Sequence, residues 1–135
     1  MPKWSLRVKH YKVRRFSNEA KNNAVSDSIL MSIASEFLFL PDGARNQYSL
    51  GASLYKLRIA SKSGKGKSGG SRSILAFKKD SLVIWLHMYG KNEKGNISHS
   101  ELTDLKKISN VLLNATEAQL MILVKNGSLE EIKNV

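Results

Sequence analysis

The chain has 135 residues and no cysteine, 41% of its residues are hydrophobic, and its formal net charge at pH 7 is +11. This length and hydrophobic content fit one domain, residues 1–135, with one modest core, so the chain need not be disordered. The lack of cysteine excludes disulfides and thiol chemistry, and the positive charge indicates an anionic partner.

The first half of the chain predicts a short strand followed by two helices. Trp4–Lys9 alternates like a strand, and Lys9–Asn22 carries apolar residues at roughly helical spacing. Ser26 is suited to cap the second helix, which ends at the turn sequence Pro41-Asp42-Gly43. The apolar positions of this second helix recur every four residues, at Ile29, Ile33 and Phe37.

The second helix also contains the longest apolar stretch of the chain. It runs over residues 29–40 and is interrupted by Glu36, whereas a membrane span needs about 20 apolar residues. The N-terminus lacks the apolar region of a secretion signal. We therefore expect a cytoplasmic protein with no membrane partner.

The middle of the chain predicts a three-stranded antiparallel meander, with strands at Leu54–Ala60, Ser71–Phe77 and Leu82–Tyr89. A Lys/Gly/Ser-rich loop follows the first strand, and a tight turn at Lys79-Asp80 follows the second. The third strand is nearly all apolar, as expected of a central strand covered on both faces.

Two helices and an edge strand are predicted after the meander. Ser98 or Ser100 caps a helix whose inward stripe consists of Leu102, Leu105, Ile108 and Leu112. A second helix covers Glu117–Lys125, and the tail adds an edge strand. The fold class is therefore α+β: a small antiparallel sheet with N-terminal helices packed on one face, followed by C-terminal helices. We expect the opposite face to display basic residues.

Positive charge is concentrated in the middle of the chain. Residues 56–94 hold ten Lys and Arg against two Asp and Glu, whereas residues 95–135 hold four against five. This concentration is the electrostatic footprint of a nucleic-acid-binding protein. A solvated surface rich in lysine is the alternative interpretation.

Four basic residues form a candidate catalytic set. Lys56 and Arg58 share one strand face, about 7 Å apart, Arg72 begins the next strand, and Lys91 follows the third. Cations around a phosphate oxygen stabilise the charge that develops in phosphoryl transfer. Because the 2′-hydroxyl of RNA can be the nucleophile, the protein needs only to orient the chain and move protons. A lysine crowded by other cations can act as the base. Alternatively, the cations only protect an exposed sheet edge.

The two basic loops supply candidate RNA-binding residues, which are Lys62, Lys65, Lys67, Ser68 and Lys94. The first loop resembles a nucleotide-binding P-loop. However, Ser61 stands where that motif needs glycine, and the loop joins two strands instead of a strand and a helix. We interpret it as a basic flap over a phosphate backbone.

His87 and Tyr89 lie near Lys91 at the end of the third strand. Either can take part in acid–base chemistry, which makes His87 a further catalytic candidate, or stack on an RNA base. We expect His87 on the same side as Trp85, where a histidine can instead be a hydrogen-bonded core residue. The histidines show no metal-ligand spacing and no carboxylate cluster is available, so we expect no metal and no cofactor.

Three blocks of sequence, in order, resemble the HigB-like branch of the RelE toxin superfamily. They are SLGASLYKLRIA at residues 49–60, GKSGGSR at residues 66–72 and YGKNEKGNI at residues 89–97. The helices on either side also fit, so the likeness spans most of the chain.

The resemblance implies a RelE-like fold and a toxin of a type II toxin–antitoxin system that cuts mRNA on the ribosome and inhibits translation. It also implies a cognate antitoxin, often of the helix-turn-helix type. The basic positions that match the family are Lys56, Arg58 and Arg72 on the strands and Lys91 and Lys94 in the turn. His87 stands where the family commonly has tyrosine, which leaves the proton-transfer group open.

The competing hypothesis is a non-catalytic protein of the same fold. Its basic cleft would bind an antitoxin, RNA or DNA gyrase without cutting anything, and the charge of +11 agrees with both hypotheses.

Overall fold

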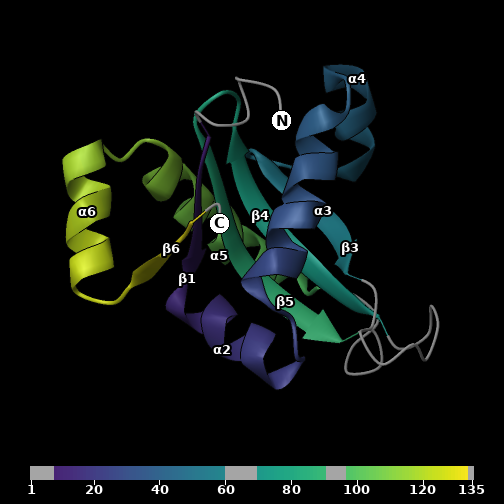
Figure 1. The fold of residues 1–135 in the computed structure, drawn as a ribbon. Helices are drawn as coiled ribbons and strands as arrows, with labels where there is room; N and C mark the ends of the chain where they lie inside the picture. Colours follow the sequence, from purple (N-terminus) through teal and green to yellow (C-terminus); the bar gives the residue numbers. More distant parts are fainter. Residues whose placement is uncertain (1–7, 60–69, 91–96, 134–135) are drawn as a thin grey trace.

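The computed structural model describes residues 8–59, 70–90 and 97–133 (Figure 1). Its strands are β1 (Lys9–Val13), β2 (Ser49–Gly51), β3 (Leu54–Ile59), β4 (Ser71–Lys78), β5 (Leu82–Gly90) and β6 (Leu129–Ile132). Its helices are α2 (Arg14–Asn22), α3 (Asp27–Phe39), α4 (Asp42–Arg45), the 3-10 helix η1 (Asn46–Tyr48), α5 (His99–Leu113) and α6 (Glu117–Lys125). Across the described ranges, no helix has the length and apolar character needed to cross a membrane.

The strands form one six-stranded sheet in the order β2-β3-β4-β5-β1-β6. Neighbouring strands are antiparallel except for β1, which runs parallel to β5. The predicted α+β class, with the meander at its centre, is confirmed. The short elements α4, η1 and β2 are additions that the sequence pattern did not predict.

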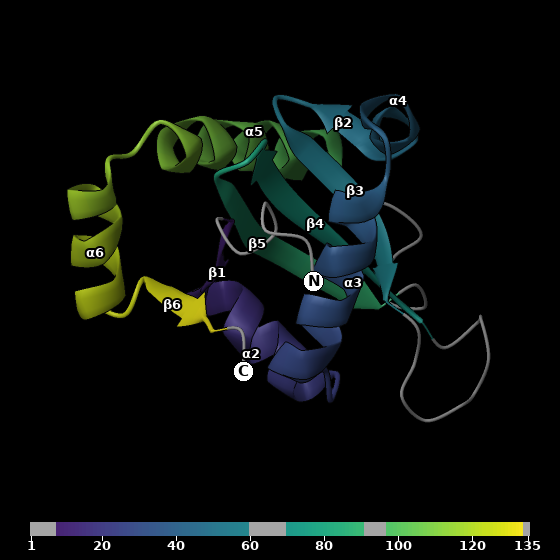
Figure 2. The ribbon, with the colours of Figure 1, turned by 45° about the horizontal axis from the view of Figure 1, so that its top comes forward.

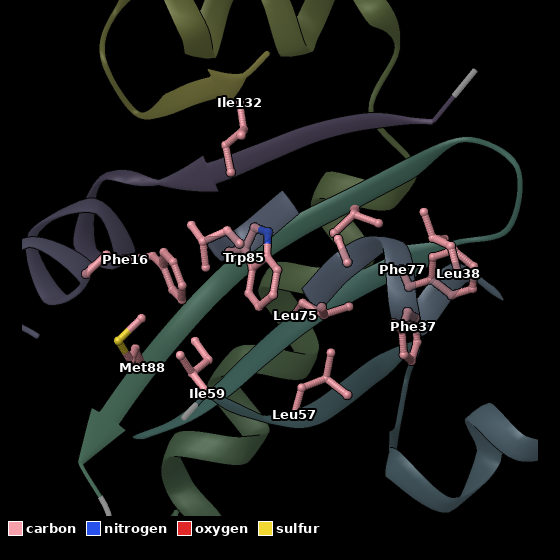
Figure 3. Packing of buried hydrophobic residues seen from close by; sticks show 14 of the residues in the cluster. Phe16, Phe37, Leu38, Leu57, Ile59, Leu75, Phe77, Trp85, Met88 and Ile132 are labelled. Atoms are coloured by element: carbon pink, nitrogen blue, oxygen red, sulfur yellow. The ribbon is translucent and has the colours of Figure 1, made fainter. Parts of the chain in front are cut away.

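Helices cover both faces of this sheet, whereas we expected them on one (Figures 1 and 2). On one face, α2 and α3 bury Phe16 and Trp85, with ring centroids 5.5 Å apart (Figure 3). On the other face, α5 buries Leu105 in a cluster with Leu54 and Ile74. The expected bare basic face is therefore wrong, because the apolar half of that face lies beneath α5.

The segment before α2 is a strand, although we expected a helix from Lys9 onward. Residues 9–13 form β1, which lies between β5 and β6 and pairs with both. Tyr11, for example, stands opposite Ile84 on one side and Glu131 on the other. Because two strands satisfy its backbone groups, this pairing outweighs the helical spacing of a few side chains. The expected strand at residues 4–9 lies mostly outside the described residues.

A β-bulge in β5 changes the face on which His87 lies. The register with β4 shifts by one residue between the pairs Ile74–His87 and Leu75–Trp85, so Leu86 is an extra residue. Before the bulge, Trp85 belongs to the core beneath α2 and α3. After the bulge, His87 stands opposite Ile74, which belongs to the cluster beneath α5. The prediction that His87 shares a side with Trp85 is therefore wrong.

The starts of α3, α5 and α6 agree with the sequence prediction. Ser26 caps α3 and Ser98 caps α5 through their side-chain oxygens, and α6 and the edge strand β6 have their predicted positions. The inward stripe of α5 is wrong at one residue. Ile108 is 42% exposed, and Ser109 is buried in its place, with its hydroxyl donating to the carbonyl of Ala52 at 2.9 Å.

Removal of the Phe16 ring tests the core between α2, α3 and the sheet. Because Phe16 is fully buried, we expect Phe16→Ala to lower the free energy of unfolding by about 3–5 kcal/mol, measured by urea denaturation followed by circular dichroism. The control is Val111→Ala on α5, where the side chain is 69% exposed and the expected change is below about 0.5 kcal/mol. Equal effects would contradict this packing.

Candidate functional site

Two rows of side chains cross β3, β4 and β5 on the face that α5 partly covers. The first row consists of Arg58, Arg72 and Tyr89, and the second of Lys56, Ile74 and His87. Directly opposite residues on neighbouring strands lie about 5 Å apart. The register therefore brings Lys56, Arg58 and Arg72 together on one face of two adjacent strands, as their spacing predicted.

Lys56 and His87 stand at opposite ends of the second row, two strand spacings apart. Those two spacings separate their backbones by about 10 Å. Arg72 belongs to the strand between them, one row further along. A group held at Arg72 would thus have a lysine on one side and an imidazole on the other.

A cleft of about 310 Å³ opens beside the basic side chains, and its lining includes Lys56, Arg58, Arg72 and residues 47–50. Arg58 is exposed, and the other two cations are half-buried. The Nη1 atom of Arg72 is buried and has no hydrogen-bond partner within the described part of the chain. A buried N–H group without an acceptor costs free energy, so an anionic oxygen at this nitrogen would be stabilised.

His87 is 2% exposed and lies between carboxylates from two helices. Its Nδ1 is 2.9 Å from Oε2 of Glu19 on α2, and its Nε2 is 3.8 Å from Oε2 of Glu101 on α5. The other oxygen of Glu19 accepts a hydrogen bond from the backbone N–H of Met88 at 3.0 Å. The ring of Tyr89 lies 5.4 Å from the imidazole, centroid to centroid. The end of β5 is thus held between α2 and α5.

The surroundings of Glu19 favour its ionised form. Burial raises the pKa of this carboxyl, but hydrogen bonds from His87 and from the N–H of Met88 oppose burial, as do the charges of His87 and Arg15. The pKa of Glu19 is therefore lowered from its ordinary value of 4.5. An ionised Glu19 can accept both hydrogen bonds at once.

Tyr89 contributes a neutral phenol to the first row. Burial raises the pKa of Tyr89, the positive charge of Arg72 opposes that rise, and the negative charge of Glu101 adds to it. The net pKa is raised, so Tyr89 stays protonated at neutral pH and can donate a hydrogen bond.

The sequence prediction missed Glu19 and Glu101. Glu19 lies 68 positions from His87, and Arg15 precedes it by four residues, a spacing typical of an exposed ion pair on a helix. Glu101 matches the acidic member of a capping box, a role that it has at Ser98. A local pattern accounts for both residues, and only the tertiary contacts connect them to His87.

Six predicted site residues lie outside the described residues: Lys62, Lys65, Lys67, Ser68, Lys91 and Lys94. Their roles stay predictions. Among residues 8–59, 70–90 and 97–133, no group of three or more His, Asp and Glu side chains is placed to hold a metal ion.

Comparison with known families supplies a match over nearly the whole chain. The family model is described as RelE toxin of RelE / RelB toxin-antitoxin system, and it matches residues 8–132. The matched range contains both side-chain rows. Among curated proteins, the chain has no match.

The lowered pKa of Glu19 predicts how stability changes with pH. A carboxyl whose pKa is lower in the folded than in the unfolded state stabilises the fold above its unfolded pKa, and this contribution is lost as the pH falls through the folded pKa. We therefore expect the stability difference between wild type and Glu19→Gln to shrink below about pH 4.5. Urea denaturation at about pH 5.5 and about pH 3 measures it. The matched control is Glu131→Gln on the exposed edge strand. The difference in free energy of unfolding between this control and wild type should be the same at both pH values.

Proposed function

The chain belongs to the RelE family of toxins of toxin–antitoxin systems, and on this premise we propose that it is an endoribonuclease that cuts mRNA on the ribosome and inhibits translation. The family implies a cognate antitoxin as partner. We further propose that the chain lies in the HigB-like branch, that its antitoxin is of the helix-turn-helix type, and that it acts in the cytoplasm, where messages are translated.

The position of Arg72 between Lys56 and His87 is the observation that supports this proposal. The 2′-hydroxyl attacks the neighbouring phosphorus while the 5′-oxygen leaves, and these two oxygens lie roughly in line. An acid and a base on opposite sides of the phosphate match that requirement. The guanidinium of Arg72 can hold two phosphate oxygens at once and stabilise the developing charge. Arg58 orients the adjoining backbone.

In the proposed reaction, the neutral amine of Lys56 takes the proton of the 2′-hydroxyl as the bond between O2′ and phosphorus forms. The bond between phosphorus and O5′ breaks, and the imidazolium of His87 donates its Nε2 proton to O5′. The products are a 2′,3′-cyclic phosphate and a free 5′-hydroxyl. Because Nε2 is buried beside Glu101, RNA reaches it only when the Glu101 side chain turns aside. The proposed mechanism uses no metal ion.

Loss of Arg72 tests the proposal. We expect Arg72→Ala to reduce cleavage of a ribosome-bound message at least 100-fold, about the effect of removing one group that stabilises a developing oxyanion, and to abolish growth arrest on expression. Cleavage is measured by primer extension, and the cyclic phosphate by its resistance to end-labelling. Lys107→Ala removes one equally positive charge from the exposed face of α5 and should keep full activity.

Two results would contradict the proposal. Full toxicity of a folded Arg72→Ala variant would remove Arg72 from the mechanism. Tight binding of the wild-type protein to ribosomes with intact mRNA would instead favour the non-catalytic hypothesis.

A further inference from the structure

Glu19 completes an edge of β5 that is not covered by a strand from residues 8–59, 70–90 or 97–133. The pairing of β1 with β5 ends at Lys12 and Trp85, and the chain then turns into α2. Beyond that point, the backbone N–H of Met88 donates to Oε1 of Glu19 at 3.0 Å. The side chain of Glu19 therefore supplies an acceptor where β1 has ended.

The same carboxylate determines which nitrogen of His87 carries a proton. An ionised carboxylate can only accept hydrogen bonds, so Nδ1 of His87, 2.9 Å from Oε2 of Glu19, must be the donor. Proton exchange is thereby restricted to Nε2. Nε2 is buried and makes no hydrogen bond within the described residues, and Oε2 of Glu101 lies 3.8 Å away.

We propose that Glu19 is a positioning residue for RNA cleavage, holding His87 with Nδ1 protonated so that Nε2 is the atom that carries the transferred proton. This inference rests on the proposed function. The arrangement follows a known chemical logic, in which a buried carboxylate orients a histidine and stabilises its imidazolium form. After the proton has passed from Nε2 to O5′, the ring is neutral, and Nδ1 still donates to Glu19.

The groups that face the imidazole come from three elements. Glu19 on α2 contacts Nδ1 of His87. Oε2 of Glu19 also forms an ion pair with Nε of Arg15 at 3.3 Å. Glu101 on α5 faces Nε2, and the neutral Tyr89 lies beside the ring on β5. Glu19 is therefore the carboxylate that stays on the imidazole when the Glu101 side chain turns aside for RNA.

The closing experiment compares wild type with Glu19→Gln and with the matched control Glu131→Gln. Nδ1 of His87 and the N–H of Met88 contact different oxygens of Glu19. A glutamine places a donating NH2 group at one of these two positions, so it cannot accept a hydrogen bond at both. Nitrogen-15 NMR of the histidine rings should give the Nδ1–H tautomer for neutral His87 in wild type and a mixture of tautomers in Glu19→Gln. In the control Glu131→Gln, the tautomer of His87 and the rate of RNA cleavage should both equal those of wild type.

Cleavage of a ribosome-bound message provides the second readout. We expect Glu19→Gln to cut at least about 10-fold more slowly, as when the orienting partner of a functional histidine is removed.

Three outcomes would overturn the inference. The first is an Nε2–H tautomer in the wild-type protein, which can be tested even if Glu19→Gln does not fold. The second is a Glu19→Gln variant with the wild-type rate. The third is a slower variant whose His87 tautomer matches that of wild type, since this pattern marks a purely structural residue. Failure of the proposed function is distinguishable, because wild type would then leave RNA intact while the tautomer still reports how Glu19 holds the ring.

Discussion

The bulge that divides β5 into two registers is the constraint on which the candidate site depends. Up to Trp85, the strand pairs with β4 on one side and β1 on the other. The extra residue Leu86 follows, and beyond it His87 aligns with Ile74 and Tyr89 aligns with Arg72. A one-residue slip of a strand moves every side chain to the other face. The register that packs the core therefore also aligns the two side-chain rows.

Local patterns were sufficient to predict part of the structure. The positions of Lys56 and Arg58 follow from the two-residue period of a strand, and Ser26 and Ser98 follow from the chemistry of a helix cap. The remainder depends on contacts between distant segments. Residues 9–13 form the strand β1 because β5 and β6 pair with them. The bulge in β5 could not be predicted, because nearly every residue of that strand is apolar and the sequence shows no alternation from which a one-residue shift could be recognised.

Charge is divided across the site as well as along the chain. The cations of β3 and β4 lie on one side, and the carboxylates of Glu19 and Glu101 lie around His87 on the other. A phosphate is attracted to the first side and repelled from the second. In the proposed mechanism, cations of β3 and β4 hold the RNA backbone, whereas carboxylates of α2 and α5 surround the imidazole of His87 on β5. The net charge of +11 does not by itself reveal this separation.

The pairing of β1 with β6 has a consequence for biosynthesis. These strands are the first and the last in chain order among the described residues, with His10 opposite Ile132. During translation, β1 emerges early, but one of its edges has no neighbour until residues 129–132 have left the ribosome. Pairings between such distant segments form slowly, because closing a long loop costs entropy before any contact offsets it. The sheet of this toxin is therefore completed only after residues 129–132 have been translated.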